Sequence, residues 1–469
     1  MRRLALLFAL TALGACGGGG TVEGPPNVLL ITVDTLRADR LGCYGCDRDT
    51  SPELDGFREE AVLFERSYSQ APFTAPSHAS LFTSLHTEEH GVLAWGMKLA
   101  PEARTYAERF GAKGWRTGAF YNHPSLSLND LERGFDEVQK RYFEPAEDTV
   151  EGFLSFAEQA GDTGEPFAAW VHLWDVHRPY AYRNWKLVQK YVQREPFAFE
   201  ETRFGSYEDV EVGRTERYYN TKPSRRAELG LPDEAWDFVD ARYDSGVWYA
   251  DRALGALFDG LRDLDLFENT VIVVTSDHGE TLRERDSVWY THDPFLFEET
   301  LRVPLLLRLP GGEHGGASVD SLARGIDVLP TLLHAADLPV TGARGRSLLD
   351  AVAGTPEEPV YLYAQTQARH PKEEGGPGPD EDGWVERREV VSDGERKLYI
   401  DRGTGKRALF DLARDPGEKR DVSADPAYSA DLERLDLALV RFRALPRLGT
   451  RREDMTPEQI KMLEDMGYL

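Results

Sequence analysis

The order of apolar and amphipathic segments predicts an α/β fold: a doubly wound, mostly parallel sheet followed by a small C-terminal antiparallel sheet. Short, continuously apolar runs recur along most of the chain, which is typical of strands buried on both faces. Amphipathic segments of helical period alternate with these runs. Toward the C-terminus, short segments separated by tight turns indicate the second sheet.

Length and charge limit the classes of protein to consider. The chain has 469 residues and a formal net charge of −26. This length suits one large α/β domain with an appendage, or two to three domains. The acidic balance argues against nonspecific binding to nucleic acid or anionic lipid, so we expect no nucleic-acid partner. The sequence does not indicate an oligomeric state.

The N-terminal segment 1–16 is predicted to be a leader rather than part of the fold. Arg2 and Arg3 precede a short apolar region at 4–13. The following Leu13-Gly14-Ala15-Cys16 is similar to a bacterial lipobox, which implies cleavage before Cys16 and lipidation of its thiol. Residues 17–25 then form a Gly-rich tether. We therefore expect a lipid-anchored, exported protein of a bacterial cell envelope, on its periplasmic or outer-surface side. The alternative is an ordinary signal peptide with an incidental cysteine.

The first part of the chain alternates between predicted strands and helices. The run at 27–33 is apolar throughout and ends in Asp34, as expected of a central strand. Ser51 and Pro52 predict a helix that continues to about residue 65, with Ser51 as its cap. The later elements are a helix that begins near Thr74, a helix over 101–113, and a strand over 115–121 that precedes Asn122.

The middle of the chain continues this alternation. Its predicted elements are a helix over 149–160, a strand over 167–174, a helix over 243–264, strands over 269–276 and 303–309, and a helix over 326–336. Residues 182–236 are polar, aromatic and irregular. We interpret this stretch as an excursion with the potential to cover the site.

The last part of the chain predicts a subdomain of its own. Residues 375–382 are Gly, Pro and acid, which indicates a loop. Short strands with tight turns are expected over 385–412, and a helix over 429–445. We therefore place the main domain at 26–355 and a C-terminal subdomain at 356–469.

Polar residues follow several predicted strands directly. Asp34, Asn122, His177 and the pair Asp277-His278 all lie just past a strand. In doubly wound sheets, ligands bind outside the carboxyl ends of the strands. The topology therefore predicts that these side chains lie near one another.

Thr74 lies at a tight turn that enters a helix, with prolines at positions 72 and 76. A hydroxyl there faces the unpaired backbone N–H groups of the first helical turn. These donors favour an oxyanion or a bound phosphate or sulfate. The alternative is a threonine that only caps the helix.

Asp34, Asp277 and His278 supply two carboxylates and an imidazole, a set that suits one divalent cation such as Mn, Ca or Zn. Such a cation would polarise the Thr74 hydroxyl, whose own pKa is too high for attack at neutral pH. The alternative is that each aspartate only caps a helix after its strand.

A second group of polar residues could act on an anionic substrate. We expect His177 and His292 to assist a leaving group, and His78 and Asn122 to stabilise the anion. The alternative for any of them is a structural role. His90, His123 and His172 are interpreted as structural.

At these residues the chain resembles the sulfatase family, within the alkaline phosphatase superfamily. The similar stretches are 27–45, 75–84, 90–92, 172–180, 243–255, 275–280, 292–304, 327–333, 409–412, 415–418 and 463–469. The resemblance runs from about residue 26 to the C-terminus. It implies an alkaline-phosphatase-like fold and a metal-assisted hydrolase, with a covalent intermediate and an anionic ester as substrate.

The chain also departs from the family pattern. Sulfatases of known type carry Cys or Ser in a Cys-x-Pro-Ser-Arg motif, which is oxidised to formylglycine. Here Thr74 stands at the nucleophile position and His78 at the arginine position, and threonine cannot become formylglycine. Thr35 replaces a metal aspartate, and Asp277-His278 stands where Asp-Asn is usual. These features resemble the threonine-nucleophile branch and the phosphonate monoester hydrolases.

The nucleophile bears on the substrate class. A formylglycine hydrate expels sulfate by reforming its carbonyl, whereas a sulfo-threonine must be cleaved by attack at sulfur. A phospho-threonine beside a metal can be hydrolysed by activated water. We therefore expect hydrolysis of phosphate or phosphonate esters ahead of sulfate esters. The alternatives are a phospho-headgroup transferase acting on envelope glycans and a non-catalytic binding lipoprotein.

Overall fold

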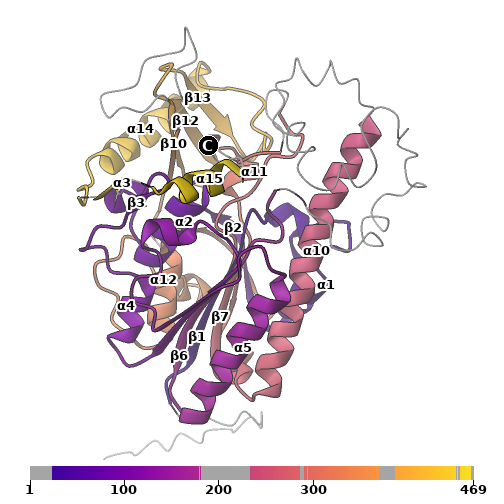
Figure 1. Ribbon diagram of the computed structural model, residues 1–469. Helices are drawn as coiled ribbons and strands as arrows, with labels where there is room; N and C mark the ends of the chain where they lie inside the picture. Colours follow the sequence, from indigo (N-terminus) through magenta and orange to yellow (C-terminus); the bar gives the residue numbers. More distant parts are fainter. Residues whose placement is uncertain are drawn as a thin grey trace, which may run out of the picture.

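A central eight-stranded sheet organises the larger part of the protein. The computed structural model describes residues 24–178, 180, 233–285, 290–292, 294–355, 358–368, 386–449, 451–452 and 455–465. The strand order is β5-β4-β6-β1-β7-β8-β2-β9, and helices cover the sheet (Figure 1). The strands are β1 Asn27–Val33, β2 Val62–Tyr68, β4 Arg116–Tyr121, β5 Glu137–Lys140, β6 Phe167–Leu173, β7 Thr270–Thr275, β8 Leu305–Arg308 and β9 Ser318–Arg324.

The central strand β1 is buried on both faces, which explains its continuous apolar run. It pairs in parallel with β6 and β7, so that Thr32 lies beside His172 and Thr275. Strand β8 is antiparallel to both of its neighbours, β7 and β2. The predicted mostly parallel sheet is therefore confirmed, with one reversed strand.

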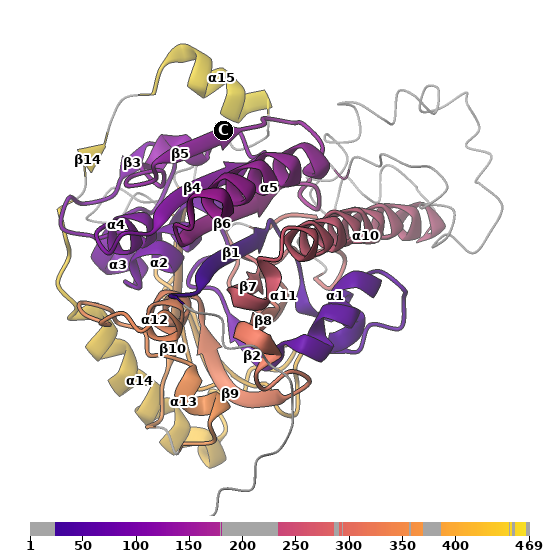
Figure 2. The same cartoon turned by 90° about the horizontal axis from the view of Figure 1, so that it is seen from below.

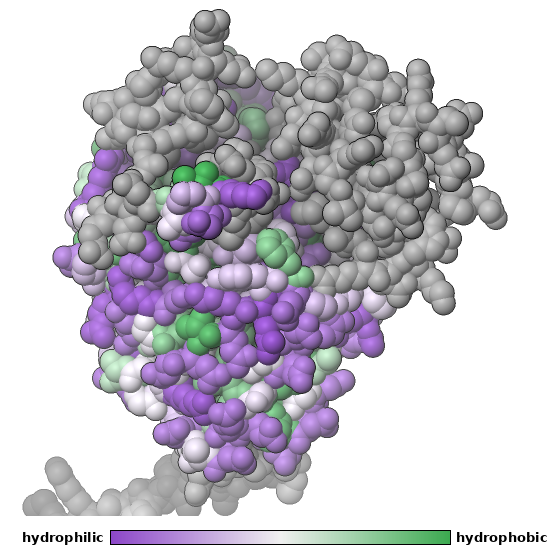
Figure 3. Space-filling model, in the orientation of Figure 1, coloured by the Kyte–Doolittle hydropathy of each residue, from purple (hydrophilic) through white to green (hydrophobic). Residues whose placement is uncertain are grey.

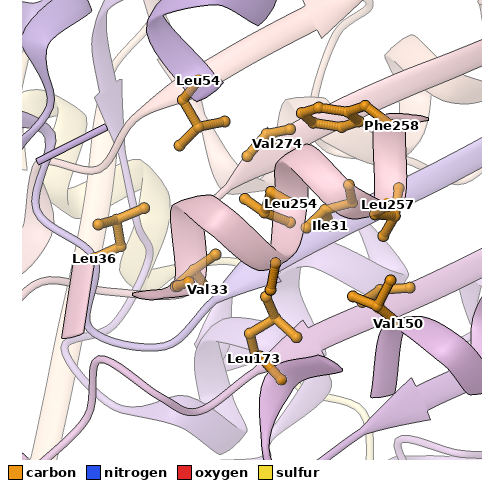
Figure 4. Close-up of a cluster of buried hydrophobic side chains, with 14 of the residues drawn as sticks. Ile31, Val33, Leu36, Leu54, Val150, Leu173, Leu254, Leu257, Phe258 and Val274 are labelled. Atoms are coloured by element: carbon orange, nitrogen blue, oxygen red, sulfur yellow. The ribbon is translucent and has the colours of Figure 1, made fainter. Parts of the chain in front are cut away.

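Two layers of helices enclose this sheet. One layer contains α1 Pro52–Phe57, α5 Ala146–Thr163 and α10 Asp233–Asp263, which pack on Leu29, Ile31 and Val33. Figure 4 shows side chains of all three helices over the strands. The other layer contains α2 Thr74–Thr83, α4 Tyr106–Gly111 and α12 Gly325–Ala335, packed on Val28 and Leu30. Figure 2 shows the two layers on opposite sides of β1.

The helix predicted over residues 51–65 is wrong in its second half. Helix α1 ends at Phe57, a short 3-10 turn follows at Arg58–Glu60, and β2 begins at Val62. Strand β2 pairs with β8 and β9, and its first three residues are buried. Helices α5 and α10 are longer than predicted, and α4 is shorter than the predicted 101–113. Most of the predicted excursion, the loop at 375–382 and the leader lie outside the described residues.

A separate antiparallel sheet forms the C-terminal part, as predicted. Its strands are β10 Leu362–Ala368, β11 Glu386–Ser392, β12 Arg396–Asp401 and β13 Arg407–Asp411, in that order. Helix α14 Ser429–Arg443 packs on one face, and Leu362, Ala364 and Val390 pack against Tyr68 of the main sheet. The remaining elements are α3 Thr87–His90, β3 Met97–Lys98, α11 Glu298–Leu301, α13 Leu349–Val352, β14 Arg451–Arg452 and α15 Pro457–Asp465.

The described surface is mainly hydrophilic on the face that Figure 3 shows, with small apolar groups scattered over it. No helix among the described residues is long and apolar enough to cross a membrane. The candidate catalytic and metal-binding side chains lie together in a buried cluster at the carboxyl ends of the central strands.

Candidate active site

The carboxyl ends of the central strands bring the predicted metal ligands together. Asp34 follows β1, and Asp277 and His278 follow β7. Each offers one ligand atom, and these atoms all lie within 4.8 Å of one another. All three side chains are fully buried.

Thr74 is the first residue of α2, and its side chain faces this group. Its Oγ1 lies 3.3 Å from His278 Nε2. Phe73, rather than Thr74, occupies the cap position, so Thr74 is not the cap of α2. One turn later, the Ser77 hydroxyl donates a hydrogen bond to the Asp277 carbonyl. That bond fixes the start of the helix against the segment that carries the candidate ligands.

The backbone determines the tautomer of His278. Its Nδ1 lies 2.9 Å from the Gly279 carbonyl oxygen, which can only accept, so Nδ1 carries the proton. In the neutral ring, Nε2 then presents a lone pair, 3.5 Å from Asp277 Oδ2 and 3.7 Å from Asp34 Oδ1. A ring oriented through one nitrogen with its other nitrogen free is the usual state of a metal-ligating histidine.

The two carboxylates fit a divalent cation. Asp277 Oδ1 accepts from the backbone N–H of His278, at 2.9 Å. By contrast, no described residue donates a hydrogen bond to Asp277 Oδ2 or to either oxygen of Asp34. Within the described chain, neither carboxylate is paired with a lysine or arginine. Buried anionic oxygens need a counter-charge, and a cation bound by this set would supply it.

The pKa values show how strongly these groups interact. Burial, and then the charge of Asp277, hold the pKa of Asp34 well above its usual range. Burial opposes ionisation of Asp277, but the neighbouring His278 imidazole outweighs it and lowers the Asp277 pKa. Burial likewise opposes charge on His278, yet Asp277 and Asp34 raise its pKa. A bound cation would displace the proton from His278, so cation binding should strengthen as pH rises.

Six buried histidines form a continuous arc of ring contacts at this site, and three of them, His123, His172 and His278, lie beside Asp34. Neighbouring ring centroids lie 4.5 to 6.2 Å apart. In order along the arc they are His78, His172, His123, His177, His292 and His278.

His78 and Asn122, which are predicted to stabilise an anion, have hydrogen-bond partners within the protein. His78 Nδ1 donates to the Thr74 carbonyl at 2.9 Å, and Nε2 contacts Thr32 Oγ1 at 3.2 Å. Burial, and then His172, lower the pKa of His78 to about 3. The Asn122 amide donates to Asp175 Oδ2 at 2.8 Å and accepts from Trp174 N at 2.7 Å. Both side chains use their polar atoms to hold neighbouring loops in place.

His177 and His292 lie beside His278 at the other end of the arc. His292 Nδ1 donates to Glu280 Oε1 at 3.3 Å, which turns Nε2 away from the carboxylate. His177 Nδ1 donates to the carbonyl oxygen of Arg178. Burial is the main cause that holds the pKa values of His177 and His292 well below the usual range. Glu280 is also buried, and burial raises its pKa to about 7.

Two residues that the sequence analysis interpreted as structural lie at the site. His172 Nε2 is 3.4 Å and His123 Nε2 is 3.6 Å from Asp34 Oδ2. His172 belongs to β6, where it is a polar residue inside an otherwise apolar, fully buried strand. That pattern could have marked His172 as a candidate site residue in the sequence, because a buried polar side chain in such a strand needs a hydrogen-bond partner.

Comparison with known proteins places the chain among sulfatases. The family model described as Sulfatase matches residues 26–338. The chain is 26% identical over 377 residues to an ulvan-active sulfatase of Formosa agariphila, covering 75% of this chain and 71% of that protein. It is 26% identical over 400 residues to an N-acetylgalactosamine-6-sulfatase of Canis lupus familiaris, covering 77% and 72%.

Solved structures share the fold. A structure in complex with its substrate D-glucosamine-2-N,6-O-disulfate has a TM-score of 0.71 at 19% identity, covering 90% of this chain and 98% of that chain. The phosphonate monoester hydrolase of Agrobacterium radiobacter has a TM-score of 0.68 at 20% identity, covering 92% and 98%. The predicted alkaline-phosphatase-like architecture is therefore confirmed.

Proposed function

The chain belongs to the sulfatase family of ester hydrolases, and on that basis we propose that it is a metal-dependent hydrolase with a covalent Thr74 intermediate. One observation carries the proposal. The Thr74 hydroxyl lies at the first residue of α2, 3.3 Å from His278 Nε2 and beside the buried group Asp34, Asp277 and His278. A nucleophile, candidate ligands and a helix N-terminus meet at this point.

In the proposed mechanism, Thr74 Oγ1 releases its proton to solvent and attacks the phosphorus or sulfur of a bound ester, and the bond from that atom to the leaving oxygen breaks. A divalent cation held by Asp34, Asp277 and His278 supplies Lewis-acid chemistry, which lowers the pKa of the hydroxyl and offsets charge on the substrate. The first turn of α2 directs backbone N–H groups toward the anion. Ser77 keeps that turn next to Asp277 through its hydrogen bond to the Asp277 carbonyl.

His292 is the proposed proton donor to the leaving oxygen, with His177 beside it. The carboxylate of Glu280 orients the His292 ring through Nδ1, and the proposal assigns Nε2 to the leaving oxygen. The buried ring is neutral in the free protein, because its pKa lies well below the usual range. A bound anionic ester would favour the imidazolium form, so the proton would be taken up together with the substrate.

The nucleophile favours phosphorus esters over sulfate esters. Threonine cannot form the aldehyde hydrate by which formylglycine releases sulfate, so the covalent threonine ester must be cleaved by direct attack. Activated water can do this at phosphorus. We therefore propose phosphate or phosphonate monoesters as the preferred class, with sulfate monoesters turned over more slowly.

The test compares matched 4-nitrophenyl esters of phosphate, phenylphosphonate and sulfate, each with Mn, Ca or Zn. Thr74→Ala should lower phosphorus-ester turnover by a factor on the order of a thousand or more, because covalent catalysis is lost. Thr83→Ala is the matched control, since Thr83 lies in the same helix and its hydroxyl bonds to the backbone of Ala79 and Leu85, away from the candidate ligands. Near-normal turnover by Thr74→Ala would contradict the mechanism. Turnover of the sulfate ester alone would contradict the proposed substrate class.

We also propose that the protein is lipid-anchored in a bacterial cell envelope. The support is the lipobox-like Leu13-Gly14-Ala15-Cys16, followed by a Gly-rich tether. Labelled palmitate should enter the wild-type protein and should be absent from Cys16→Ser. Equal labelling of both, or none of the wild type, would contradict the anchor.

A further inference from the structure

We propose that Phe143 and Trp174 form a subsite for the leaving group of the ester, and that this subsite selects esters of ring-bearing alcohols, aryl or sugar. The inference deepens the proposed function and rests on its assignment of His177 and His292 to the leaving oxygen. It adds a part of the site that contacts the substrate outside the buried polar cluster.

The two aromatic residues lie at the carboxyl ends of strands next to the buried cluster. Trp174 directly follows β6, and Phe143 lies in the turn 141–144 after β5. Strand β4 lies between β5 and β6, and β6 is a neighbour of the central strand β1. The subsite is therefore at the edge of the sheet where ligands bind in doubly wound folds.

A series of ring contacts leads from the leaving-group histidines to these two residues. The ring centroids of His292 and His177 lie 5.3 Å apart. The indole of Trp174 stacks on His177 at 5.3 Å, with 26° between the ring planes. Phe143 meets Trp174 edge-on, at 5.4 Å and 69°. A leaving group attached to the oxygen beside His292 would therefore have these two rings next to it.

The series changes from buried to exposed along its length. His292 and His177 are 4% and 2% exposed, Trp174 is half-buried, and Phe143 is 55% exposed. Single apolar side chains are common on protein surfaces. This ring, however, continues a series that reaches the candidate active site, and binding sites are lined mainly by apolar and aromatic side chains.

The backbone of Phe143 is strained. Its φ is +61°, in the left-handed region. Among the described residues other than glycine with positive φ, Phe143 alone has an entirely apolar side chain. Glycine would occupy this position at lower cost than a bulky residue. A large ring that is kept at such a position and is exposed to solvent indicates a role in binding rather than in packing.

Asn122 holds together the two loops that carry the rings. Its side-chain amide donates to the Glu144 carbonyl at 3.0 Å, and its side-chain oxygen accepts from the backbone N–H of Trp174 at 2.7 Å. The backbone N–H of Phe143 donates to the main-chain carbonyl of Asn122 at 3.2 Å. The two rings are therefore preorganised, so little ordering of the loops opposes binding.

The chemistry of the two side chains specifies the class of alcohol. Indole and phenyl rings are uncharged, and they stack on an aryl ring or on the apolar face of a pyranose. A short alkyl group would cover little of either ring. The subsite therefore fits a ring-bearing leaving group ahead of a short alkyl alcohol.

The test measures binding of benzylphosphonate and ethylphosphonate to the zinc-loaded full chain by isothermal titration calorimetry. In each probe a methylene group replaces the ester oxygen, so affinity is measured without turnover. We expect the wild type to bind benzylphosphonate about tenfold more tightly than ethylphosphonate, the effect of one stacked ring. Equal affinities, or no binding of either probe, would overturn the inference.

Variants show whether the two rings cause this preference. Trp174→Ala and Phe143→Gly should each reduce the preference to less than about threefold, and Phe143→Gly also relieves the positive φ. Tyr142→Ala is the matched control, because Tyr142 is 38% exposed in the same turn but its ring contacts Tyr121, at 6.4 Å. Melting temperatures show that each variant is folded. An undiminished preference in both ring variants, or an equal loss in Tyr142→Ala, would overturn the inference.

Turnover then distinguishes the two kinds of ring. Phosphate release is measured from phenyl phosphate, glucose 6-phosphate and trifluoroethyl phosphate. Trp174→Ala should lower kcat/KM by about tenfold for at least one of the two ring esters and leave trifluoroethyl phosphate within about twofold of wild type. The ring ester with the larger loss identifies the alcohol as aryl or sugar. Equal fractional losses for all three esters would overturn the inference.

The binding result and the ester assays fail independently. A ring preference that depends on Phe143 and Trp174, without ester turnover, would support the inference and contradict the proposed function. Ester turnover without a ring preference would do the reverse.

Discussion

Gly279 offers a sharp test of how the backbone positions His278. It follows His278 directly, and its carbonyl accepts the Nδ1 proton that sets the histidine tautomer. Its own N–H donates to the carbonyl of Thr300 at 2.9 Å. A Cβ added at Gly279 would lie 2.2 Å from the carbonyl oxygen of Glu299. The change Gly279→Ala therefore acts on the ligand geometry without removing any polar group.

The size of the effect follows from that contact. Real Cβ atoms essentially never come within 3.0 Å of such an atom, so the segments must separate by at least 0.8 Å, the difference between 3.0 and 2.2 Å. Productive sites tolerate about 0.5 Å, and a displacement of about 1 Å costs on the order of 100-fold in rate. We therefore expect kcat/KM to fall about 100-fold, equal to about 2.7 kcal/mol in the activation free energy.

The assay is kcat/KM for the best nitrophenyl ester, together with zinc affinity. Gly56→Ala is the matched control, because a Cβ at Gly56 in α1 would meet nothing within 4 Å. Melting temperatures of both variants show whether the fold is intact. If folded Gly279→Ala kept kcat/KM and zinc affinity within about threefold of wild type, the argument for steric control of His278 would be wrong.

Three further predictions address the nucleophile, the pH dependence of stability and a buried ion pair. Thr74→Ser keeps a hydroxyl, so it should retain ester turnover within about tenfold of wild type, and complete loss would argue against a hydroxyl nucleophile. Burial raises the pKa of Asp251 to about 7, so its stabilising effect is full below its unfolded pKa and is lost as pH rises through the folded value. The melting temperature of wild type relative to Asp251→Asn should therefore fall between about pH 4 and pH 7, and a constant difference would contradict this. Lys397 is fully buried against Glu298 at 3.1 Å and Glu418 at 2.9 Å. Lys397→Met removes the cation that the two buried carboxylates share and leaves Glu418 with Arg285 alone, so urea unfolding should show a loss of about 3 to 5 kcal/mol, and a loss below about 1 kcal/mol would contradict the pairing argument.

Most of the sheet could be predicted from the sequence because its strands are buried on both faces. Residues 27–33 and 270–275 have no exposed position, and such runs are unmistakable in the sequence. Strand β2 was missed because Glu65 and Arg66 interrupt its apolar pattern and reach toward solvent. Its pairing with β8 and β9 depends on segments far along the chain.

The sequence predicted the candidate site residues only where they directly follow a strand, because there the topology of the sheet determines which residues lie close together. The rule that ligands bind past the strand ends placed Asp34, Asp277 and His278 together, and the structure shows that grouping. The same rule selected Asn122, whereas the structure directs its neighbour His123 to Asp34. Position at a strand end does not tell which of two consecutive side chains points inward.

His172 lies inside a strand, so its proximity to Asp34 depends on the register between β1 and β6. A single sequence does not specify that register. The hydrogen bonds beside His172 depend in turn on Thr32, Trp170 and His78, which come from three different elements.

The central claim is that Thr74 forms a covalent intermediate, and the stereochemical course at phosphorus tests it most directly. The substrate is a thiophosphate monoester made chiral at phosphorus with oxygen isotopes and hydrolysed in isotope-labelled water. Attack by Thr74 followed by attack of water inverts the configuration at each step, so we predict net retention. Net inversion would show that water attacks the ester directly, and it would contradict the covalent Thr74 mechanism.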